Sequence, residues 1–346
     1  NTTGTANVAV GALAGDALTV GSSNVAIGYN SLSTEDGHGA NVAVGTNSLA
    51  VQNAGANGYN TAVGHNAGLS VTTAVETTLV GALAGDAITT GGYNTGFGSA
   101  ALGATTTATF NTAVGRNALG ANTTGASNVA VGGQALDANT TADNNTAVGT
   151  SSLGASTTGT SNTAVGQASL GSNTTASNNT AVGKGALTAN TTGTANTAVG
   201  TSALIANTTA NSNTAIGKDA LLANTTGTRN VGVGASALKT ITTASFNTGV
   251  GNDVLGANTS GASNTGIGDQ ALGANTTGAD NTAIGSGALD ANTTADGNTA
   301  VGSSCLGANT TGADNVAMGE AALLSNTTAA NNTGIGTSAL RANTTG

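Results

Sequence analysis

The sequence predicts an all-β chain, a parallel β-solenoid of about twenty coils of 17 residues each, arranged side by side as a homotrimer. Three observations lead to this prediction: a 17-residue repeat, alternating apolar residues within each repeat, and the absence of proline. A short fixed period is typical of solenoids, in which each repeat forms one coil and stacks on its neighbours. Proline lacks the N–H group that a continuous hydrogen-bond ladder requires, so its absence fits continuous pairing.

The repeat extends through all 346 residues, which we expect to form a single array. We number its 17 positions as slots, and slot 1 is the residue before Thr-Ala-Val-Gly or its equivalent. The coils begin at Asn7, Asn24, Asn41, Asn60, Thr77 and Asn94, and from Asn111 onward at every seventeenth residue. Residues 1–110 form irregular coils, with a two-residue insertion before Asn60, whereas residues 111–346 form regular ones. Because the sequence begins and ends within a repeat, we expect it to be an excerpt of a longer fibre.

The first part of each repeat has the pattern of a short strand. Slot 2 is Val or Thr, slot 4 is apolar and slot 5 is Gly in every coil, while slot 3 is small in nearly all of them. Period-two alternation over so few positions is typical of a strand. We therefore expect slots 2 and 4 to point into a narrow core and slots 3 and 5 to point outward.

The second part of each repeat returns to the core. After a bend at slots 6–8, slot 9 is Leu in most coils, and slots 11–15 are expected to form another extended segment. From Asn111 onward every charged residue lies in slots 6, 7, 10, 16 or 17, which we expect to be solvated because a buried charge is costly. Slot 15 alternates between Gly and Ala, which adds a weaker 34-residue period.

Asparagine forms two columns, at slots 1 and 12. Stacking would place successive members about 4.8 Å apart, so their amides are expected to hydrogen-bond from coil to coil. The residues that we expect to form the structural core and turns are represented by Val114, Gly115, Leu119, Asn122, Val131, Gly132, Leu136 and Asn139.

The predicted core is thin, because each coil offers few large apolar side chains beyond those at slots 4 and 9. The side that carries small residues at slot 3 and Gly at slot 5 is smooth, and smooth surfaces allow backbones to approach closely. We therefore expect this side to pack against identical chains, most simply around a threefold axis.

Two segments resemble a known family. Residues 24–31, "NVAIGYNS", and residues 41–48, "NVAVGTNS", resemble head repeats of trimeric autotransporter adhesins, and the longer form "NTAVGxxALxANTTG" is similar to repeats of phage-type tail fibres. The resemblance implies a left-handed β-roll, three chains side by side, and an extracellular location on a cell surface or in a virion tail fibre. It also implies adhesion to a cell-surface glycan or protein receptor, which we expect to contact the irregular coils before Phe110.

The composition argues against several other classes of function. Only six residues are Lys or Arg and the formal net charge is −9, so no basic stripe is available for nucleic acid. No apolar run approaches the roughly 18–20 residues that a membrane span requires, so we expect no membrane insertion. The single cysteine, Cys305, excludes an internal disulfide and a Cys-based metal site, and we expect it to be a buried small residue.

No pattern of catalytic or metal-binding residues is evident, so we expect neither an enzyme nor a cofactor. His38 and His65 lie in separate coils without a recognisable pattern of carboxylates, and we expect both to be exposed bend residues. Asp16 and Asp86 occur in two similar segments, which we interpret as a duplicated surface bend.

An alternative function comes from the threonine columns at slots 13 and 14, which begin at Thr123 and Thr124 in the regular coils. Flat threonine arrays on β-solenoids are typical of ice-binding surfaces. Because adjacent residues of an extended segment point in opposite directions, we expect only one of these two columns to face outward.

Overall fold

The computed structural model describes residues 1–345 and confirms a parallel β-solenoid. All regular secondary structure in these residues is β, in short strands that each occupy slots 2–4 of one coil. No helix long and apolar enough to cross a membrane is found among the described residues. The chain divides into two compact units, Asn1–Ala176 and the unit that begins at Ser177.

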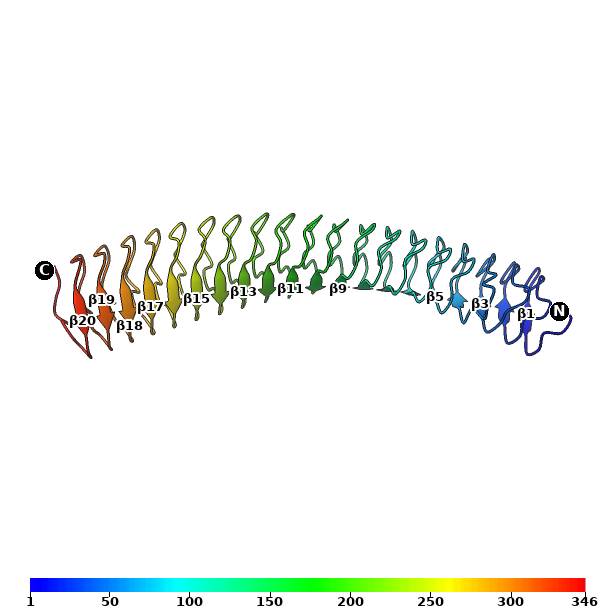
Figure 1. The fold of residues 1–346 in the computed structure, drawn as a ribbon, viewed down its shortest axis with the longest axis horizontal. Coiled ribbons are helices and arrows are strands. Elements are labelled where there is room, and N and C mark those ends of the chain that lie inside the picture. Colours follow the sequence, from blue (N-terminus) through cyan, green and yellow to red (C-terminus); the bar gives the residue numbers. More distant parts are fainter. Residues whose placement is uncertain (346) are drawn as a thin grey trace. The chain divides into compact units, whose positions relative to one another are not determined.

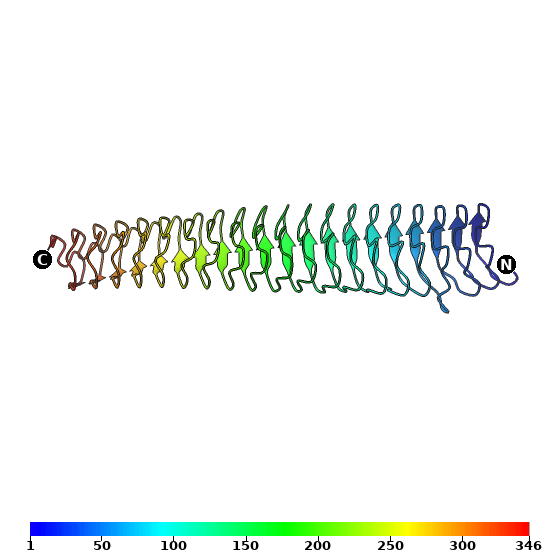
Figure 2. The same ribbon diagram turned by 90° about the horizontal axis from the view of Figure 1, so that it is seen from above.

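Within each unit, successive strands lie side by side in parallel (Figures 1 and 2). The first unit contains β1 (Val8–Val10), β2 (Val25–Ile27), β3 (Val42–Val44), β4 (Thr61–Val63), β5 (Thr78–Val80), β6 (Thr95–Phe97), β7 (Thr112–Val114), β8 (Val129–Val131), β9 (Thr146–Val148) and β10 (Thr163–Val165). The second unit contains β11 (Thr180–Val182), β12 (Thr197–Val199), β13 (Thr214–Ile216), β14 (Val231–Val233), β15 (Thr248–Val250), β16 (Thr265–Ile267), β17 (Thr282–Ile284), β18 (Thr299–Val301), β19 (Val316–Met318) and β20 (Thr333–Ile335).

Strand pairing follows the repeat. Thr112 of β7 pairs with Val129 of β8, and Val114 pairs with Val131, so each slot lies beside the same slot of the next coil. The insertion before Asn60 leaves this register intact, because Val42 of β3 pairs with Thr61 of β4. The same side chain therefore recurs at every step along a column, and each slot acts as a continuous stripe within its unit.

Our expectation for the direction of the strand side chains is wrong. Val114 and Val131, which we expected in the core, are half-exposed, whereas Ala113 and Ala130 at slot 3 are fully buried. Coils with a fully buried leucine at slot 9, such as Leu119, have only Ala or Gly at slot 3, whereas the coil with Gly85 at slot 9 buries Leu79 at slot 3. The larger β-branched side chains consequently point outward.

The leucine and asparagine predictions are confirmed. Leu119, Leu136, Asn122 and Asn139 are all fully buried. Leu119 has a φ of 51°, in the left-handed region that bulky residues rarely adopt. This conformation directs the leucine side chain back into the coil.

The volume inside a coil is conserved by paired changes in the sequence. In three irregular coils slot 9 is Gly and slot 12 is aliphatic, in the pairs Gly15 and Leu18, Gly68 and Val71, and Gly85 and Ile88. A Cβ on Gly85 would lie only 2.7 Å from Ile88 Cδ1, so this coil has no space for a larger residue at slot 9. The coil of Asn230 differs, because it buries both Leu238 at slot 9 and Ile241 at slot 12 and has Gly232 at slot 3. Likewise, a Cβ on Gly266 at slot 3 would lie 2.7 Å from Val254 Cγ2 of the preceding coil.

The glycine of slot 5 is required by both conformation and space. Gly115 has a φ of 135°, and a Cβ there would lie 2.5 Å from the carbonyl oxygen of Gly132. Gly132 also has a φ of 135°, and a Cβ there would lie 2.6 Å from the carbonyl carbon of Gly149. Both observations confirm Gly115 and Gly132 as turn residues.

Two buried asparagine ladders join the coils. At slot 1, the backbone N–H of Asn128 donates to Oδ1 of Asn111 at 3.0 Å, and at slot 12, Nδ2 of Asn139 donates to Oδ1 of Asn122 at 2.9 Å. The ladders meet within each coil, because Nδ2 of Asn111 and Nδ2 of Asn122 both donate to the carbonyl oxygen of Gly125 at 2.9 Å. This confirms the predicted bonding from coil to coil.

Interruptions in the ladders leave polar atoms without partners. In the coil after that of Asn139, slot 12 is Ser156 instead of Asn, and in the coil after that of Asn224, slot 12 is Ile241. Neither residue offers an amide to Oδ1 of the preceding asparagine. Among the described residues, both oxygens are buried without a hydrogen bond, and so is Oγ of Ser156. Each ladder amide is therefore satisfied only when the next coil supplies a matching amide.

The 34-residue period has a physical basis in slot 16. In several coils with Gly at slot 15, the N–H group of the following residue bonds to a polar side chain of the next coil. Ala126 N–H donates to Oδ1 of Asp143 at 2.6 Å, and Ala279 N–H donates to Oδ1 of Asp296 at 2.7 Å. A Cβ on Gly125 would collide with the carbonyl oxygen of Ala142, which explains why the first coil of each pair carries Gly.

Replacing Ser156 by Asn should repair the slot 12 ladder. The new amide would donate to the unpartnered Oδ1 of Asn139, and one buried hydrogen bond contributes about 1 kcal/mol to the free energy of unfolding. Urea denaturation followed by circular dichroism should therefore show a higher midpoint for Ser156→Asn. The control Thr141→Asn, at an exposed slot 14, should change stability by less than about 0.5 kcal/mol. A lower midpoint for Ser156→Asn than for the control would contradict the ladder's role.

Candidate interaction surfaces

The outward-facing side chains of the strands form two parallel stripes, one at slot 2 and one at slot 4, which together we call the strand face. It consists of the slot 2 side chains, Thr or Val, and the slot 4 side chains, which are aliphatic except at Phe97 and Met318. No slot 4 side chain is fully buried in the described coils, and Ile216 and Ile267 are 40% and 39% exposed. An apolar stripe that continues from coil to coil exceeds the scattered exposure that is normal for a soluble monomer.

The threonines of slot 2 have unengaged hydroxyl groups. Thr112, Thr146 and Thr163 are half-exposed, and their side chains make no hydrogen bond within the described structure. The slot 13 hydroxyls differ, because Oγ1 of Thr123 donates to the carbonyl oxygen of Thr140 at 2.9 Å. As expected, only one of the two columns at slots 13 and 14 faces fully outward, namely slot 14, represented by Thr124.

Exposed aromatic side chains gather at slot 17 of the first unit, in what we call the aromatic column. Tyr93 and Phe110 stack with ring centroids 4.9 Å apart and an interplanar angle of 6°. Tyr59 occupies the same slot two coils before Tyr93, with Glu76 between them. Tyr59 and Phe110 are 58% and 60% exposed. Tyr93 and Phe110 are 17 residues apart, which is the length of one coil, so the sequence spacing is enough to predict that their rings stack.

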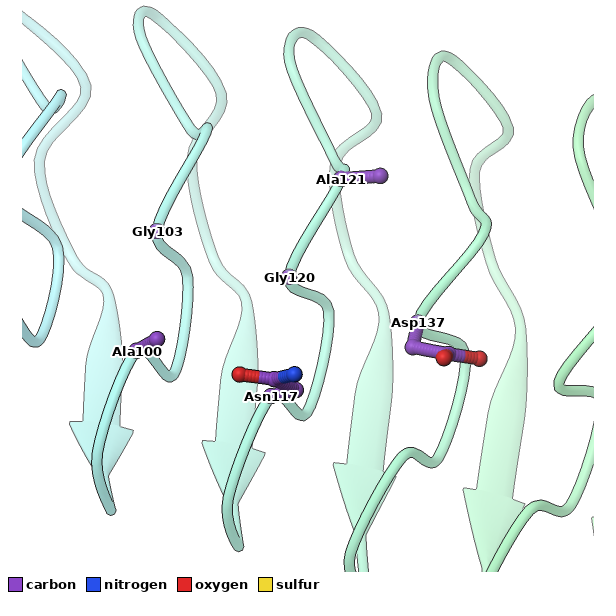
Figure 3. A pocket seen from close by; sticks show the side chains of 6 residues that line it. All are labelled: Ala100, Gly103, Asn117, Gly120, Ala121 and Asp137. Carbon is purple, nitrogen blue, oxygen red and sulfur yellow. The ribbon is translucent and has the colours of Figure 1, made fainter.

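A shallow groove crosses the bend on another side of the first unit (Figure 3). Three successive coils line it, through Ala100, Gly103, Asn117, Gly120, Ala121 and Asp137. Burial raises the pKa of Asp137, although N–H groups of the backbone partly oppose the shift. Stability associated with this carboxyl group is therefore greatest while it is protonated and falls as the pH rises through its folded pKa. The lining residues offer one carboxyl group, that of Asp137, and one amide, that of Asn117.

The remaining candidate residues lie apart from one another. Asp16 and His65 are exposed, as expected for bend residues, and Asp86 is half-buried, with its pKa raised by burial. Cys305 is free and fully buried, and burial raises the pKa of its thiol. This confirms its expected role as a small core residue.

The prediction for His38 is wrong. Its side chain is only 30% exposed, and Nδ1 lies 3.4 Å from Oε1 of Glu35, whose side chain is fully buried. The sequence interpretation missed Glu35 because it did not assign this residue to slot 12, where the regular coils carry a buried Asn. Aligning the irregular coil by its slot 5 glycine, Gly28, gives that assignment.

Comparison with known proteins adds no assignment to these surfaces. No family model matches the chain, and no curated protein is found to be similar to it.

Proposed function

We propose that this chain is a non-enzymatic structural and adhesive fibre protein that assembles with identical chains through the strand face. The observation that carries the proposal is the partly exposed aliphatic stripe at slot 4, which recurs in every described coil. A contiguous exposed apolar stripe favours association with another molecule, because association removes its apolar surface from water. Assembly through this side replaces the expected contact through slots 3 and 5, since slot 3 lies inside the coil.

A second copy of the chain is the partner that fits the strand face best. The face carries no charged residue at slots 2 or 4, so identical copies meet without like-charge repulsion. Its side chains recur at the strand spacing of about 4.8 Å, and every copy has the same spacing. If one coil of the first copy fits against one coil of the second, the same fit therefore repeats along the whole contact. A threefold arrangement would cover the slot 4 stripe of each copy in a closed assembly.

The adhesive part of the proposal rests on the aromatic column. Tyr59, Tyr93 and Phe110 expose flat ring surfaces outside the strand face. Aromatic rings combine apolar contact area with little conformational entropy, and tyrosine adds a hydroxyl group. These properties suit contact with a cell-surface glycan or protein receptor, and a fibre with this role would work outside the cell, on a cell surface or in a virion tail.

Charged substitutions on the strand face should prevent assembly. Light scattering coupled to size-exclusion chromatography should show a trimeric wild type and a monomeric Val148→Lys, Val165→Lys variant, because lysine keeps its ammonium group in water. The matched control is Thr141→Lys, Thr158→Lys, which places the same charges at exposed slot 14. A monomeric wild type, or a strand-face variant that is still trimeric, would disprove the proposed contact.

Removing the aromatic column should reduce adhesion without affecting assembly. Serine occupies slot 17 in several regular coils, for example at Ser127 and Ser161, so Tyr93→Ser with Phe110→Ser keeps a residue that the fold accepts. On a glycan array, we expect the double variant to lose at least about 90% of the wild-type signal, since each stacked ring contributes roughly 1 kcal/mol. Equal signals from trimeric wild type and trimeric variant would remove the aromatic column from the proposal.

Ice binding is the second candidate function, and the unengaged hydroxyl groups of slot 2 favour it. The two functions compete for the same surface, because assembly would cover the strand face. Thermal hysteresis of the purified chain separates them: the fibre proposal predicts none, whereas an ice-binding surface would give hysteresis that a bulky Thr163→Tyr substitution abolishes. Hysteresis with this sensitivity would favour the second function.

A further inference from the structure

The coil that begins at Asn24 carries chemistry that the regular coils lack. Glu35 occupies slot 12 and His38 occupies slot 15, the positions of Asn122 and Gly125 in a regular coil. In the regular coil, Nδ2 of slot 12 bonds to the carbonyl oxygen of slot 15 at 2.9 Å, so this backbone brings the two slots together. The same geometry places a carboxylate beside an imidazole.

The carboxylate of Glu35 is buried and incompletely satisfied. Its side chain is 0% exposed, Oε1 accepts the backbone N–H of His38 at 2.9 Å, and Oε2 has no hydrogen-bond partner. The neighbouring coils supply no donor at slot 12, because Leu18 is apolar and Gln52 Nε2 donates to Oδ1 of Asn41 at 3.3 Å. A buried carboxylate without compensation is costly, and a bound cation would compensate it.

Two further groups complete a set of three ligands. Nδ1 of His38 is buried and makes no hydrogen bond, and Asp36 contributes an exposed carboxylate. One ligand atom from each of Glu35, Asp36 and His38 lies within 4.8 Å of the other two. The 3.4 Å between Nδ1 of His38 and Oε1 of Glu35 matches the edge of a tetrahedron with metal–ligand bonds of about 2.1 Å.

We propose that Glu35, Asp36 and His38 bind one divalent transition-metal ion, such as Zn²⁺. An imidazole with two carboxylates suits this class of ion, whereas calcium prefers six to eight oxygen ligands. The exposed side of Asp36 leaves room for a water molecule as a further ligand. The ion would join slots 12 and 15 of this coil, where the asparagine ladder is interrupted.

The test is a titration of the full chain, free of any histidine tag, with Zn²⁺ in competition with a chromophoric chelator. We expect about one Zn²⁺ per wild-type chain and at least roughly tenfold weaker binding in Glu35→Asn, His38→Ala, which loses two of three protein ligands. This variant restores residue types found at the same slots in regular coils, Asn139 and Ala142, so it should keep its strand content by circular dichroism.

A matched control and a second readout complete the test. His65→Ala removes the other histidine, which is exposed, and should bind Zn²⁺ like the wild type. Zn²⁺ should also raise the thermal unfolding midpoint of the wild type and of His65→Ala but not that of Glu35→Asn, His38→Ala, because a ligand stabilises only the state that binds it. Absence of Zn²⁺ binding by the wild type, or equal binding by all three chains, would overturn the proposal.

Discussion

The structure depends on the continuity of hydrogen bonds between buried asparagine side chains. A 17-residue coil cannot enclose a conventional apolar core, and Asn111 and Asn122 are buried in the same coil as Leu119. A buried amide is tolerated only when its donors and acceptor are paired. The next coil provides that pairing, so no coil is satisfied alone, and the need for a matching neighbour explains why the repeat varies so little after Asn111.

The second constraint is volume. Leu119 adopts a left-handed backbone conformation that costs roughly 1–2 kcal/mol, and burying its side chain returns about 1.5–3 kcal/mol. Gly85 relieves that conformational cost in its own coil, and Ile88 then fills the space from slot 12. Most coils thus fill the interior with leucine at slot 9 and an amide at slot 12, whereas others place an aliphatic residue such as Ile88 or Ile241 at slot 12. Only the first arrangement extends the ladder.

The sequence predicted the period, the strand position, the glycine turn and both ladders, because each depends on spacing along the chain. It did not predict which side of the strand faces inward. Alternation of Thr112, Ala113 and Val114 defines two faces but not their direction, and the usual preference for burying Val assumes more interior space than this coil has. Glu35 and His38 were missed for a related reason, since their proximity depends on a bend that only the regular coils reveal.

The asparagine ladders have a direction. Asn128 donates to Asn111, Asn139 donates to Asn122, and the same sense recurs in the second unit, where Asn292 donates to Asn275. One edge of a coil consequently presents amide donors and the opposite edge presents acceptors. If the stretch of gene that encodes one coil is duplicated, the inserted coil has a donor edge and an acceptor edge that match those of its two new neighbours. A coil inserted in the opposite direction would place donors against donors and acceptors against acceptors. Lengthening by tandem duplication is therefore the route of growth that the chemistry of each edge permits.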